Sequence, residues 1–275
     1  MEYAEYAPSP RLSNVLRCIW TLGGQVDDLA TAAQPILPDS RSEIIIHLGD
    51  PFERIHGNGA VERQPDAIFA GQLRSSLVVR PTGRISVVGV RFRADGTPAL
   101  IGCPQHVLAG LTLDLGDLSA SLARQLRDVT AAQPSLSQAA HAVDECLQSQ
   151  LDESRIDPCV RRAIGAIQRQ RGAGSVDDIA VVTGLSRRHL ERRFQEVVGL
   201  SPKRFARITR FQHALRIFEQ GASGRRGVVT AAVCGYADQA HFIRDFSELA
   251  GCSPEAHLLR NAMLSRLFAE GSVRL

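Results

Sequence analysis

The chain has 275 residues, of which 44% are hydrophobic and 22% charged, and this is enough apolar material for one large or two ordinary domains. The formal net charge is only +3, but it is unevenly divided: residues 1–151 carry 12 basic and 16 acidic residues, whereas residues 152–275 carry 20 basic and 13 acidic residues. An acidic half joined to a basic half suggests that only the second half meets a polyanion.

The sequence shows no sign of export or membrane insertion. The first residues, Met1–Tyr6, contain neither the basic segment nor the apolar run of a signal peptide. No apolar stretch approaches the roughly 20 residues that span a bilayer. The six cysteines are scattered without a Cys-x-x-Cys pair. We therefore expect a soluble, cytoplasmic protein with reduced thiols and no membrane partner.

Residues 1–115 are rich in β-type segments that are separated by Gly and Pro turns. In the last segment Val88, Val90 and Phe92 alternate with small or charged residues, as in a strand with one buried face. Regularly spaced short strands predict a small β-barrel of the cupin or jelly-roll type. The predicted strands cover residues 17–22, 43–48, 67–70, 76–80 and 85–93.

The same region offers side chains that could form an effector pocket. Each of them also has an ordinary structural interpretation: a single tryptophan is more often a core residue than a binding platform, and the arginines could face solvent. We find no cluster of His and Glu that would bind a metal, no nucleophile elbow and no phosphate loop. We therefore predict no metal, no cofactor and no catalytic residue. The pocket candidates are Trp20, Asp39, Arg41, Glu43, His47, Arg80 and Arg91.

Residues 116–151 follow a helical pattern. Apolar residues recur every three to four positions over 118–129 and again over 136–151. Two such helices either pack on the β-rich part, which we favour, or form a dimer interface, so that both a monomer and a homodimer stay open. We place the domain boundary after this segment, with a sensor- or dimerisation-like domain over 1–151 and a second domain over 152–275.

The second domain contains one short pattern twice, at a constant offset of 52 residues. His189, Leu190, Arg192, Phe194, Gly199, Ser201 and Pro202 match His241, Phe242, Arg244, Phe246, Gly251, Ser253 and Pro254. This repetition indicates one supersecondary unit used twice. In each copy a glycine turn and a capping Ser or Asp precede the longer helix, as in a helix-turn-helix. We predict helix-turn-helix units over 175–199 and 227–250, joined by a linker helix over 201–220.

Each predicted recognition helix presents polar side chains on its outer face. Arginine can donate two hydrogen bonds to guanine, glutamate can accept one from cytosine, and an alanine methyl group can touch thymine. The alternative is that these are ordinary solvated charges. Because Asp245 follows Arg244, we expect the second surface to be less basic than the first. The predicted base contacts are Arg188, Glu191, Arg192, Gln239, Ala240, His241 and Arg244, and the predicted phosphate contacts are Arg187, Arg193, Lys203 and Arg204.

These motifs resemble the AraC/XylS family of bacterial transcription regulators. The matching segments are Gly235–Phe246, Gly251–Pro254 and Gly199–Leu200–Ser201–Pro202, together with Arg210 and Ala214 in the linker helix. The resemblance covers about residues 157–260. It implies two helix-turn-helix units on a long helix, and it places the family's base-contacting positions on the seven residues named above.

The resemblance also implies double-stranded DNA as a partner, with RNA polymerase and a small-molecule effector as further partners. An activating role is one expectation, and the sign of regulation stays open. The first half resembles an uncharacterised sensor-like module that some members of this family carry. Its matching segments are Leu37–Ser40, Glu43–Pro51, Val79–Arg84 and Val88–Arg93.

The predicted protein is thus an α+β chain that regulates transcription and is not an enzyme. Two alternatives stay open on the sequence. One is a DNA repair or modifying protein that uses the same module for targeting, with Cys18 or Cys103 as an alkyl acceptor. The other is a ligand- or partner-binding protein with a vestigial DNA-binding domain.

Overall fold

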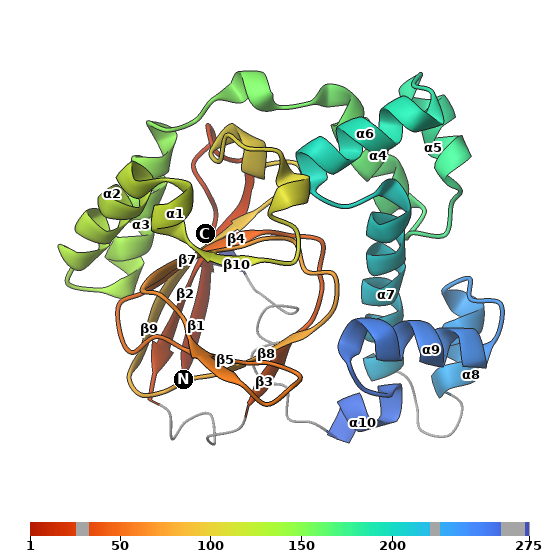
Figure 1. Cartoon of the computed structure of the whole chain (residues 1–275), viewed down its shortest axis with the longest axis horizontal. Coiled ribbons are helices and arrows are strands. Elements are labelled where there is room, and N and C mark those ends of the chain that lie inside the picture. Colours follow the sequence, from red (N-terminus) through yellow and green to blue (C-terminus); the bar gives the residue numbers. More distant parts are fainter. Residues whose placement is uncertain (26–32, 221–225, 260–272, 275) are drawn as a thin grey trace.

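A computed structural model describes residues 1–25, 33–220, 226–259 and 273–274 of the chain. A region of two β-sheets and flanking helices lies beside an all-helical region, and the long helix α7 (Pro202–Gln220) runs along the side of the helical region that faces the sheets (Figure 1). The α+β class expected from the sequence is confirmed. In the described part of the chain, no helix is both long and apolar enough to cross a membrane.

The strands form two separate sheets. A seven-stranded sheet has the order β10-β7-β4-β9-β2-β1-β11, in which only the β1–β11 pair is parallel, and a four-stranded antiparallel sheet has the order β3-β8-β5-β6. The strands are β1 (Glu2–Tyr6), β2 (Leu16–Gly24), β3 (Gln34–Ile36), β4 (Glu43–His47), β5 (Glu53–Ile55), β6 (Val61–Arg63), β7 (Ala67–Ala70), β8 (Leu77–Arg80), β9 (Ile85–Phe92), β10 (Thr112–Asp114) and β11 (Val273–Arg274).

The expected cupin or jelly-roll barrel is not confirmed as a closed structure. Among the described strands, each one pairs only within its own sheet, so the hydrogen-bond ladder does not pass from one sheet to the other. The five predicted strands correspond to β2, β4, β7, β8 and β9. These are the segments whose alternating apolar residues make a strand recognisable, whereas β5 and β6 are three-residue strands with little burial.

The seven-stranded sheet is covered on one face by helices. Ile44 and Ile46 of β4 belong to a buried core that also contains Leu126 and Val143 from helices α2 and α3. The favoured packing of these helices on the β-rich part is therefore confirmed. Side chains alternate along a strand, and those of the other face, such as Trp20 of β2 and Val87 of β9, share a second buried core with Val79 of β8 in the four-stranded sheet. The helices of this region are α1 (Leu115–Leu118), α2 (Ala120–Ala131) and α3 (Leu136–Gln148), with short 3-10 turns η2 (Thr97–Ala99), η3 (Gln105–Val107) and η4 (Glu153–Arg155).

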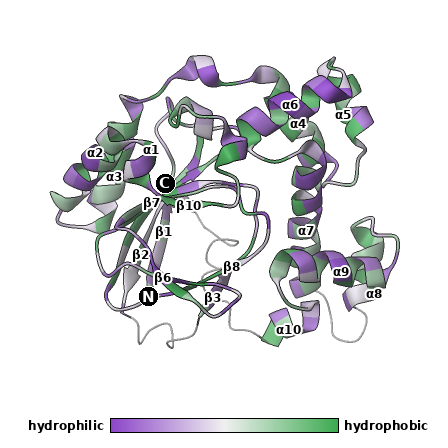
Figure 2. Cartoon of the chain, in the orientation of Figure 1, coloured by the Kyte–Doolittle hydropathy of each residue, from purple (hydrophilic) through white to green (hydrophobic). Residues whose placement is uncertain are grey.

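The helical region has a core of interlocking aromatic rings around α7. Phe205, Phe211 and Phe218 of α7 are fully buried and pack against phenylalanines of the flanking helices. α6 alternates hydrophilic and hydrophobic segments, as an amphipathic helix does (Figure 2). The other helices of the region are α4 (Pro158–Arg169), α5 (Val176–Thr183), α6 (Arg187–Val198), α8 (Arg226–Val233), α9 (Gln239–Ala250) and α10 (Pro254–Leu259).

The two helix-turn-helix units are built by the local signals that the sequence carries. Ser175 and Asp178 form a capping box at the start of α5, and Ser186 caps α6. The turn glycines Gly184 and Gly235 both have φ of 70°, in the left-handed region where a side chain would be strained. α5 with α6, and α8 with α9, are therefore the two copies of the predicted unit.

Candidate functional site

The first recognition helix, α6, has a buried side and a basic outer side. Leu190 and Phe194 are fully buried, whereas Arg188 and Arg192 are exposed one helical turn apart. No ion pair to another described residue is formed by either of these two arginines. Glu191 between them is half-buried and accepts a hydrogen bond of 3.3 Å from Nε of Arg187. Arg188 and Arg192 are thus available to an external partner.

The predicted phosphate contacts differ in how far they are already engaged. Arg187 pairs with the half-buried Glu191 and with the exposed Asp177, with closest N···O distances of 3.3 and 3.5 Å. Arg193 pairs with Asp157, the N-cap of α4, at 2.6 Å, and this hydrogen bond raises the pKa of Arg193. Lys203, in the first turn of α7, is exposed.

Arg204 holds α7 to its neighbours on two sides. It donates to the backbone carbonyl of Arg74 in the β-rich region and pairs with Glu248 of α9 at 3.3 Å. Arg193 and Arg204 therefore act as internal braces in this structure. Their assignment to phosphate stays a prediction, because binding phosphate would mean exchanging a protein partner for DNA.

The second recognition helix, α9, is capped by Asp238, whose carboxylate accepts from the backbone N–H of His241 at 2.6 Å. Gln239, Ala240 and Arg244 are exposed. His241 is half-buried, with its ring 5.2 Å from the ring of Tyr236 in an edge-on contact. The outer face of α9 therefore carries one arginine at the positions where α6 carries two.

The expectation that Asp245 reduces the positive charge of this outer face is wrong. Asp245 is only 5% exposed and points into the protein, where it accepts hydrogen bonds from Nε of Arg207 on α7 and from the hydroxyl of Tyr236 at 3.0 Å. It follows Phe242 by three positions, so it lies on the same buried face of the helix. Helical spacing could have revealed this, but adjacency to Arg244 suggested an outward position.

Arg207 also binds Glu248 of α9, at 2.5 Å. This hydrogen bond lowers the pKa of Glu248 to about 2. One arginine of α7 thus binds two acidic residues of α9 and fixes the second unit on the long helix. The sequence motifs did not assign this role to Arg207.

The β-rich region contacts the C-terminal ends of both recognition helices. The backbone N–H of Ser76 donates to the carbonyl of Leu249 near the end of α9, at 2.8 Å. At the end of α6, a Cβ on Gly199 would lie 2.7 Å from the carbonyl oxygen of Gln105 in η3. The capped N-terminal ends, which carry Arg188 and Gln239, remain exposed.

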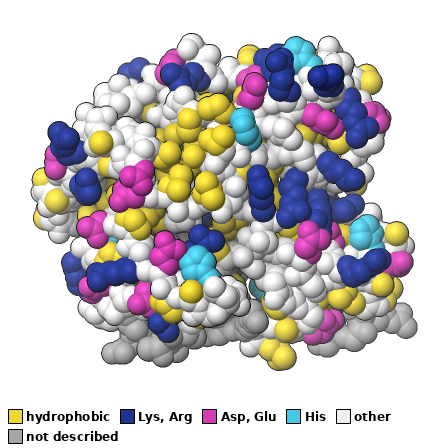
Figure 3. Space-filling model, viewed as in Figure 1, with side chains coloured by type: hydrophobic (Ala, Val, Ile, Leu, Met, Phe, Trp, Pro, Cys, Tyr) yellow, Lys and Arg dark blue, Asp and Glu magenta, His cyan; other side chains and the backbone are white. Residues whose placement is uncertain are grey.

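Basic side chains gather over the helical region. Lys and Arg side chains (dark blue) cluster over α7 and at the end of the molecule that carries α5 and α6 (Figure 3). Hydrophobic side chains instead form a patch over the β-rich region in the same view. This distribution agrees with the charge division along the sequence.

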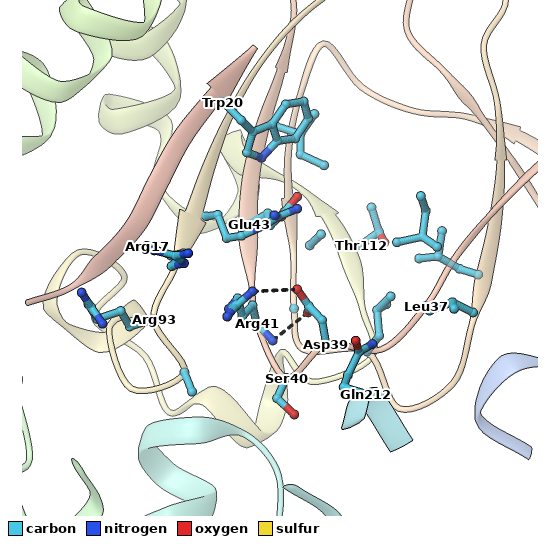
Figure 4. Close-up of a pocket in the computed structure, with 18 of the residues that line it drawn as sticks. Arg17, Trp20, Leu37, Asp39, Ser40, Arg41, Glu43, Arg93, Thr112 and Gln212 are labelled. Carbon is cyan, nitrogen blue, oxygen red and sulfur yellow. Dashed lines mark hydrogen bonds and ion pairs between the residues drawn. The ribbon is translucent and has the colours of Figure 1, made fainter. Parts of the chain in front are cut away.

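A cavity of about 810 Å³ lies between the two sheets and extends to α4 and α7. Of the predicted pocket residues, Trp20, Asp39, Arg41, Glu43, His47 and Arg91 line it. Arg80 is not among its lining residues, and its guanidinium pairs with Glu53 at 2.6 Å within the four-stranded sheet. Figure 4 shows Trp20 at one side of this cavity and Arg17, Arg41 and Arg93 at the other.

The inner part of the cavity wall contains a buried ionic network. Arg91 lies 2.5 Å from Glu43 and 3.5 Å from Glu5, and all three side chains are at most 15% exposed. Burial raises the pKa of Glu43, although the positive charge of Arg91 opposes this shift. The network connects β1, β4 and β9, and it fixes the floor of the cavity.

Neither cysteine proposed as an alkyl acceptor has a reactive environment. Cys18 is fully buried, and burial raises the pKa of its thiol to about 12. Burial also raises the pKa of Cys103. Because the thiolate is the nucleophile, both thiols are poor acceptors at neutral pH. Within the described residues, no group of three or more His, Cys, Asp or Glu side chains could hold a metal ion.

Sequence comparison finds one domain match in each half of the chain. A helix-turn-helix domain profile matches residues 179–260, and the profile of a domain of unknown function (DUF6597) matches residues 4–114. Over 79 residues the chain is 33% identical to the HTH-type transcriptional regulator GbdR of Pseudomonas aeruginosa, a match that covers 29% of this chain and 21% of that protein. The chain thus spans about a fifth of the length of this curated relative.

Two solved structures are similar to the chain, one over a little more than a third of its length and the other over most of it. A probable AraC family transcriptional regulator from Rhodopseudomonas palustris is 30% identical and covers 38% of this chain and 97% of its own, with a TM-score of 0.34. ToxT of Vibrio cholerae is 12% identical and covers 88% of this chain and 97% of its own, with a TM-score of 0.46.

Two helix-turn-helix units on one long helix define a class of bacterial DNA-binding regulators, and the sequence matches agree with that class. Residues 179–260 are an AraC-type helix-turn-helix domain of the kind found in transcriptional regulators, and residues 4–114 match a domain of unknown function.

Proposed function

We propose that the chain is a sequence-specific DNA-binding transcriptional regulator whose helices α6 and α9 enter consecutive major grooves. The observation that carries this proposal is the state of the arginines on α6. Arg188 and Arg192 are exposed and have no ion-pair partner in the described structure, whereas Arg187 and Arg193 beside them are paired. Arginines left in this state on a recognition helix suit bidentate contacts to guanine.

The placement of the two helices supports the same proposal. α7 has 19 residues and is therefore about 28 Å long, close to the ~34 Å of one DNA turn. In helix-turn-helix proteins, the N-terminal residues of the recognition helix contact the bases. Here the β-rich region contacts the C-terminal ends of α6 and α9 and leaves the N-terminal ends exposed.

We assign the base contacts to the exposed faces of α6 and α9, with Arg188 and Arg192 as the strongest contacts. Of the four predicted phosphate contacts, Lys203 is exposed and, within the described residues, is the one that forms no ion pair. Arg187, Arg193 and Arg204 would have to exchange an internal partner for phosphate. The remaining proposed base contacts are Glu191, Gln239, Ala240, His241 and Arg244.

We assign residues 1–151 as a sensor domain of cupin-like type and residues 152–275 as the DNA-binding domain. The cavity of about 810 Å³ supports an effector site, since pockets for small ligands have volumes of roughly 300–1,000 Å³. Residues 260–272 of the second domain lie outside the described structure. We expect double-stranded DNA and, through regulation of transcription, RNA polymerase as partners of a monomer or homodimer without enzymatic activity.

The experiment that tests this function is selection of bound sites from random duplex DNA by the full chain, followed by footprinting. We expect two protected half-sites about 10 base pairs apart, centre to centre, with affinity that falls steeply as salt rises. Enrichment of no sequence would contradict the proposal and favour the vestigial DNA-binding domain.

A further inference from the structure

The cavity has walls from both domains. The β-rich region supplies most of its lining, but Ile164 and Gln168 of α4 and Phe205, Gln212 and Leu215 of α7 also line it. The domains are connected beside the cavity, because Nε2 of Gln212 donates to the carbonyl of Pro38 at 2.6 Å. A molecule that fills this space would therefore touch the sensor domain and the helix that carries both DNA-binding units.

Positive charge is concentrated at the end of the cavity that lies near the helical domain. Arg17, Arg41 and Arg93 come from the β-rich region, and Figure 4 shows their side chains gathered at one side of the cavity. Arg161 of α4 and Arg216 of α7 also line it.

The acidic residues at this end are fewer than the arginines. Asp95 is bound to Arg161 at 2.7 Å, and Asp39 lies 3.7 Å from Arg41. The nearby charges of Arg17, Arg161 and Arg41 add to burial in lowering the pKa of Arg93, as expected where like charges crowd together. Over the whole lining, six arginines (Arg17, Arg41, Arg91, Arg93, Arg161 and Arg216) outnumber four acidic residues (Glu5, Asp39, Glu43 and Asp95), which leaves an excess of positive charge that an anion would balance.

The opposite end of the cavity is lined mainly by apolar side chains. Trp20 is 2% exposed, and a Cβ on Gly89 would lie 1.9 Å from its indole ring, so the ring rests directly on the strand at this glycine. Ile45, Phe52 and Val87 line the same end. This surface suits an apolar group that is excluded from water.

This end also contains one buried imidazole, that of His47. His47 lines the cavity and is 6% exposed; neither ring nitrogen makes a hydrogen bond of good geometry to a described residue, although the side chain of Gln64, which also lines the cavity, interacts with the ring. Buried polar groups are nearly always hydrogen-bonded, so an imidazole without a well-formed hydrogen bond on a cavity wall suits a polar atom of a ligand. This observation is independent of the arginines.

We propose that the cavity binds a small organic anion whose acidic group lies among Arg17, Arg41 and Arg93 and whose apolar body extends toward Trp20, with Gln212 and Arg216 of α7 completing the site. The binding itself does not depend on the proposed function. The regulatory consequence rests on the proposed function: because the ligand contacts both domains, we expect its binding to be coupled to DNA binding, and such coupling has the same magnitude in both directions.

The test uses two probes that differ in one charge. 1-Anilinonaphthalene-8-sulfonate is a fluorescent organic anion, and N-phenyl-1-naphthylamine has the same rings without the sulfonate. We expect one molecule of the anion to bind per full-length chain, and the neutral probe to bind about tenfold more weakly, since a hydrogen bond to a charged group contributes that much. Equal affinities for the two probes would overturn the proposal.

Matched variants locate the site. Arg17→Gln, Arg93→Gln and Arg216→Gln each should weaken binding of the anion several-fold, to about tenfold, and leave the neutral probe unchanged. Arg124→Gln, at an exposed position on α2, should change neither affinity. Ile45→Trp should block both probes by filling the apolar end. Circular dichroism verifies that each variant folds, since anilinonaphthalene dyes also bind partly unfolded chains.

Two further results would decide the details. Unchanged anion affinity in all three arginine variants would place the probe elsewhere and overturn the proposal. Loss of affinity in Arg17→Gln and Arg93→Gln but not in Arg216→Gln or Gln212→Ala would contradict the contribution of α7. Because none of these measurements uses DNA, their failure is distinguishable from failure of the proposed regulator function.

Discussion

Arg161 of α4 binds Asp95 of the β-rich region, with Nε of the arginine 2.7 Å from the carboxylate. The same arginine donates through Nη2 to the backbone carbonyl of Asn14 at 2.7 Å. Asp95 is 4% exposed, so its charge is balanced inside the domain interface and not by water. One side chain at the start of the DNA-binding domain thus binds two separate segments of the other domain.

Replacing Arg161 should therefore loosen the domain interface. We expect Arg161→Gln to lower the free energy of unfolding by about 1–3 kcal/mol, because Asp95 keeps its charge but loses its partner. Urea unfolding of the full chain measures this loss. The neighbouring Arg162→Gln is the control, since Arg162 is exposed. Equal midpoints for the two variants would show that the ion pair does not hold the domains together.

The second helix-turn-helix unit should depend on Asp245. Asp245→Asn removes the buried charge that Arg207 binds, and we expect a loss of about 2–4 kcal/mol in the stability of this unit. Glu248→Gln removes the other partner of Arg207 at a position that is 56% exposed, and should cost less than about 1 kcal/mol. Thermal unfolding followed by circular dichroism compares them, and a larger effect of Glu248→Gln would contradict this ranking.

The stability of the sensor domain should depend on pH through His47. Burial lowers the pKa of His47 from 6.5 to about 4, so the folded protein binds this proton less readily than the unfolded chain. The stability that neutral His47 provides is complete above pH 6.5 and is lost as the pH falls from 6.5 toward 4, by up to about 3 kcal/mol.

His47→Leu should flatten that part of the pH profile. Urea midpoints followed through the fluorescence of Trp20, the single tryptophan, report on this domain. His106→Gln, at an exposed position in η3, should retain the slope of the unmodified chain. An unchanged slope in His47→Leu would assign the pH dependence to other groups, of which Asp66 is the acidic residue whose charge acts on His47.

Gly89 should be intolerant of any side chain because of Trp20. A Cβ at this position would lie 1.9 Å from the indole ring, so Gly89→Ala forces the ring to move. We expect a loss of about 1–3 kcal/mol and a shift in tryptophan emission. Gly57→Ala is the matched control, since its Cβ would meet no described atom within 4 Å. Emission that is unchanged in Gly89→Ala would contradict the contact.

DNA specificity should be reduced most by changes at Arg188 and Arg192. Each alanine variant should lose about 1–3 kcal/mol of discrimination between the selected site and a site changed at one base pair. Arg187→Ala should weaken binding to both sites equally, because a phosphate contact carries no sequence information. Competition binding at one fixed salt concentration measures these differences, and full discrimination in Arg188→Ala would remove it from the base contacts.

Local signals made most of the helical domain predictable. The caps Ser175, Ser186 and Asp157 and the turn glycine Gly184 act within a few residues of their own position, and each lies where the sequence indicates. The apolar stripes of α2 and α3 likewise pack on the sheet as expected. Such features depend on spacing along one element, which a sequence displays directly.

The contacts between elements were not predictable in this way. Asp245 looks like a surface residue beside Arg244, and its inward partner Arg207 is 38 positions away. The separation of the strands into two sheets depends on pairings such as β2 with β9, between segments far apart in the chain. Arg80 was grouped with the pocket residues, although its binding to Glu53 holds it within the four-stranded sheet. These outcomes are decided by three-dimensional packing.

Lys203 is the only lysine of the chain, and it is exposed in the first turn of α7. A protease that cuts after lysine therefore has one target bond, and cleavage there would separate the two helix-turn-helix units into different fragments. Because a helix must open locally before a protease can cut it, the rate of this one cut reports how firmly α7 is held. Digestion with and without DNA, followed as the loss of the full-length band, would therefore measure how DNA binding changes the local opening of α7.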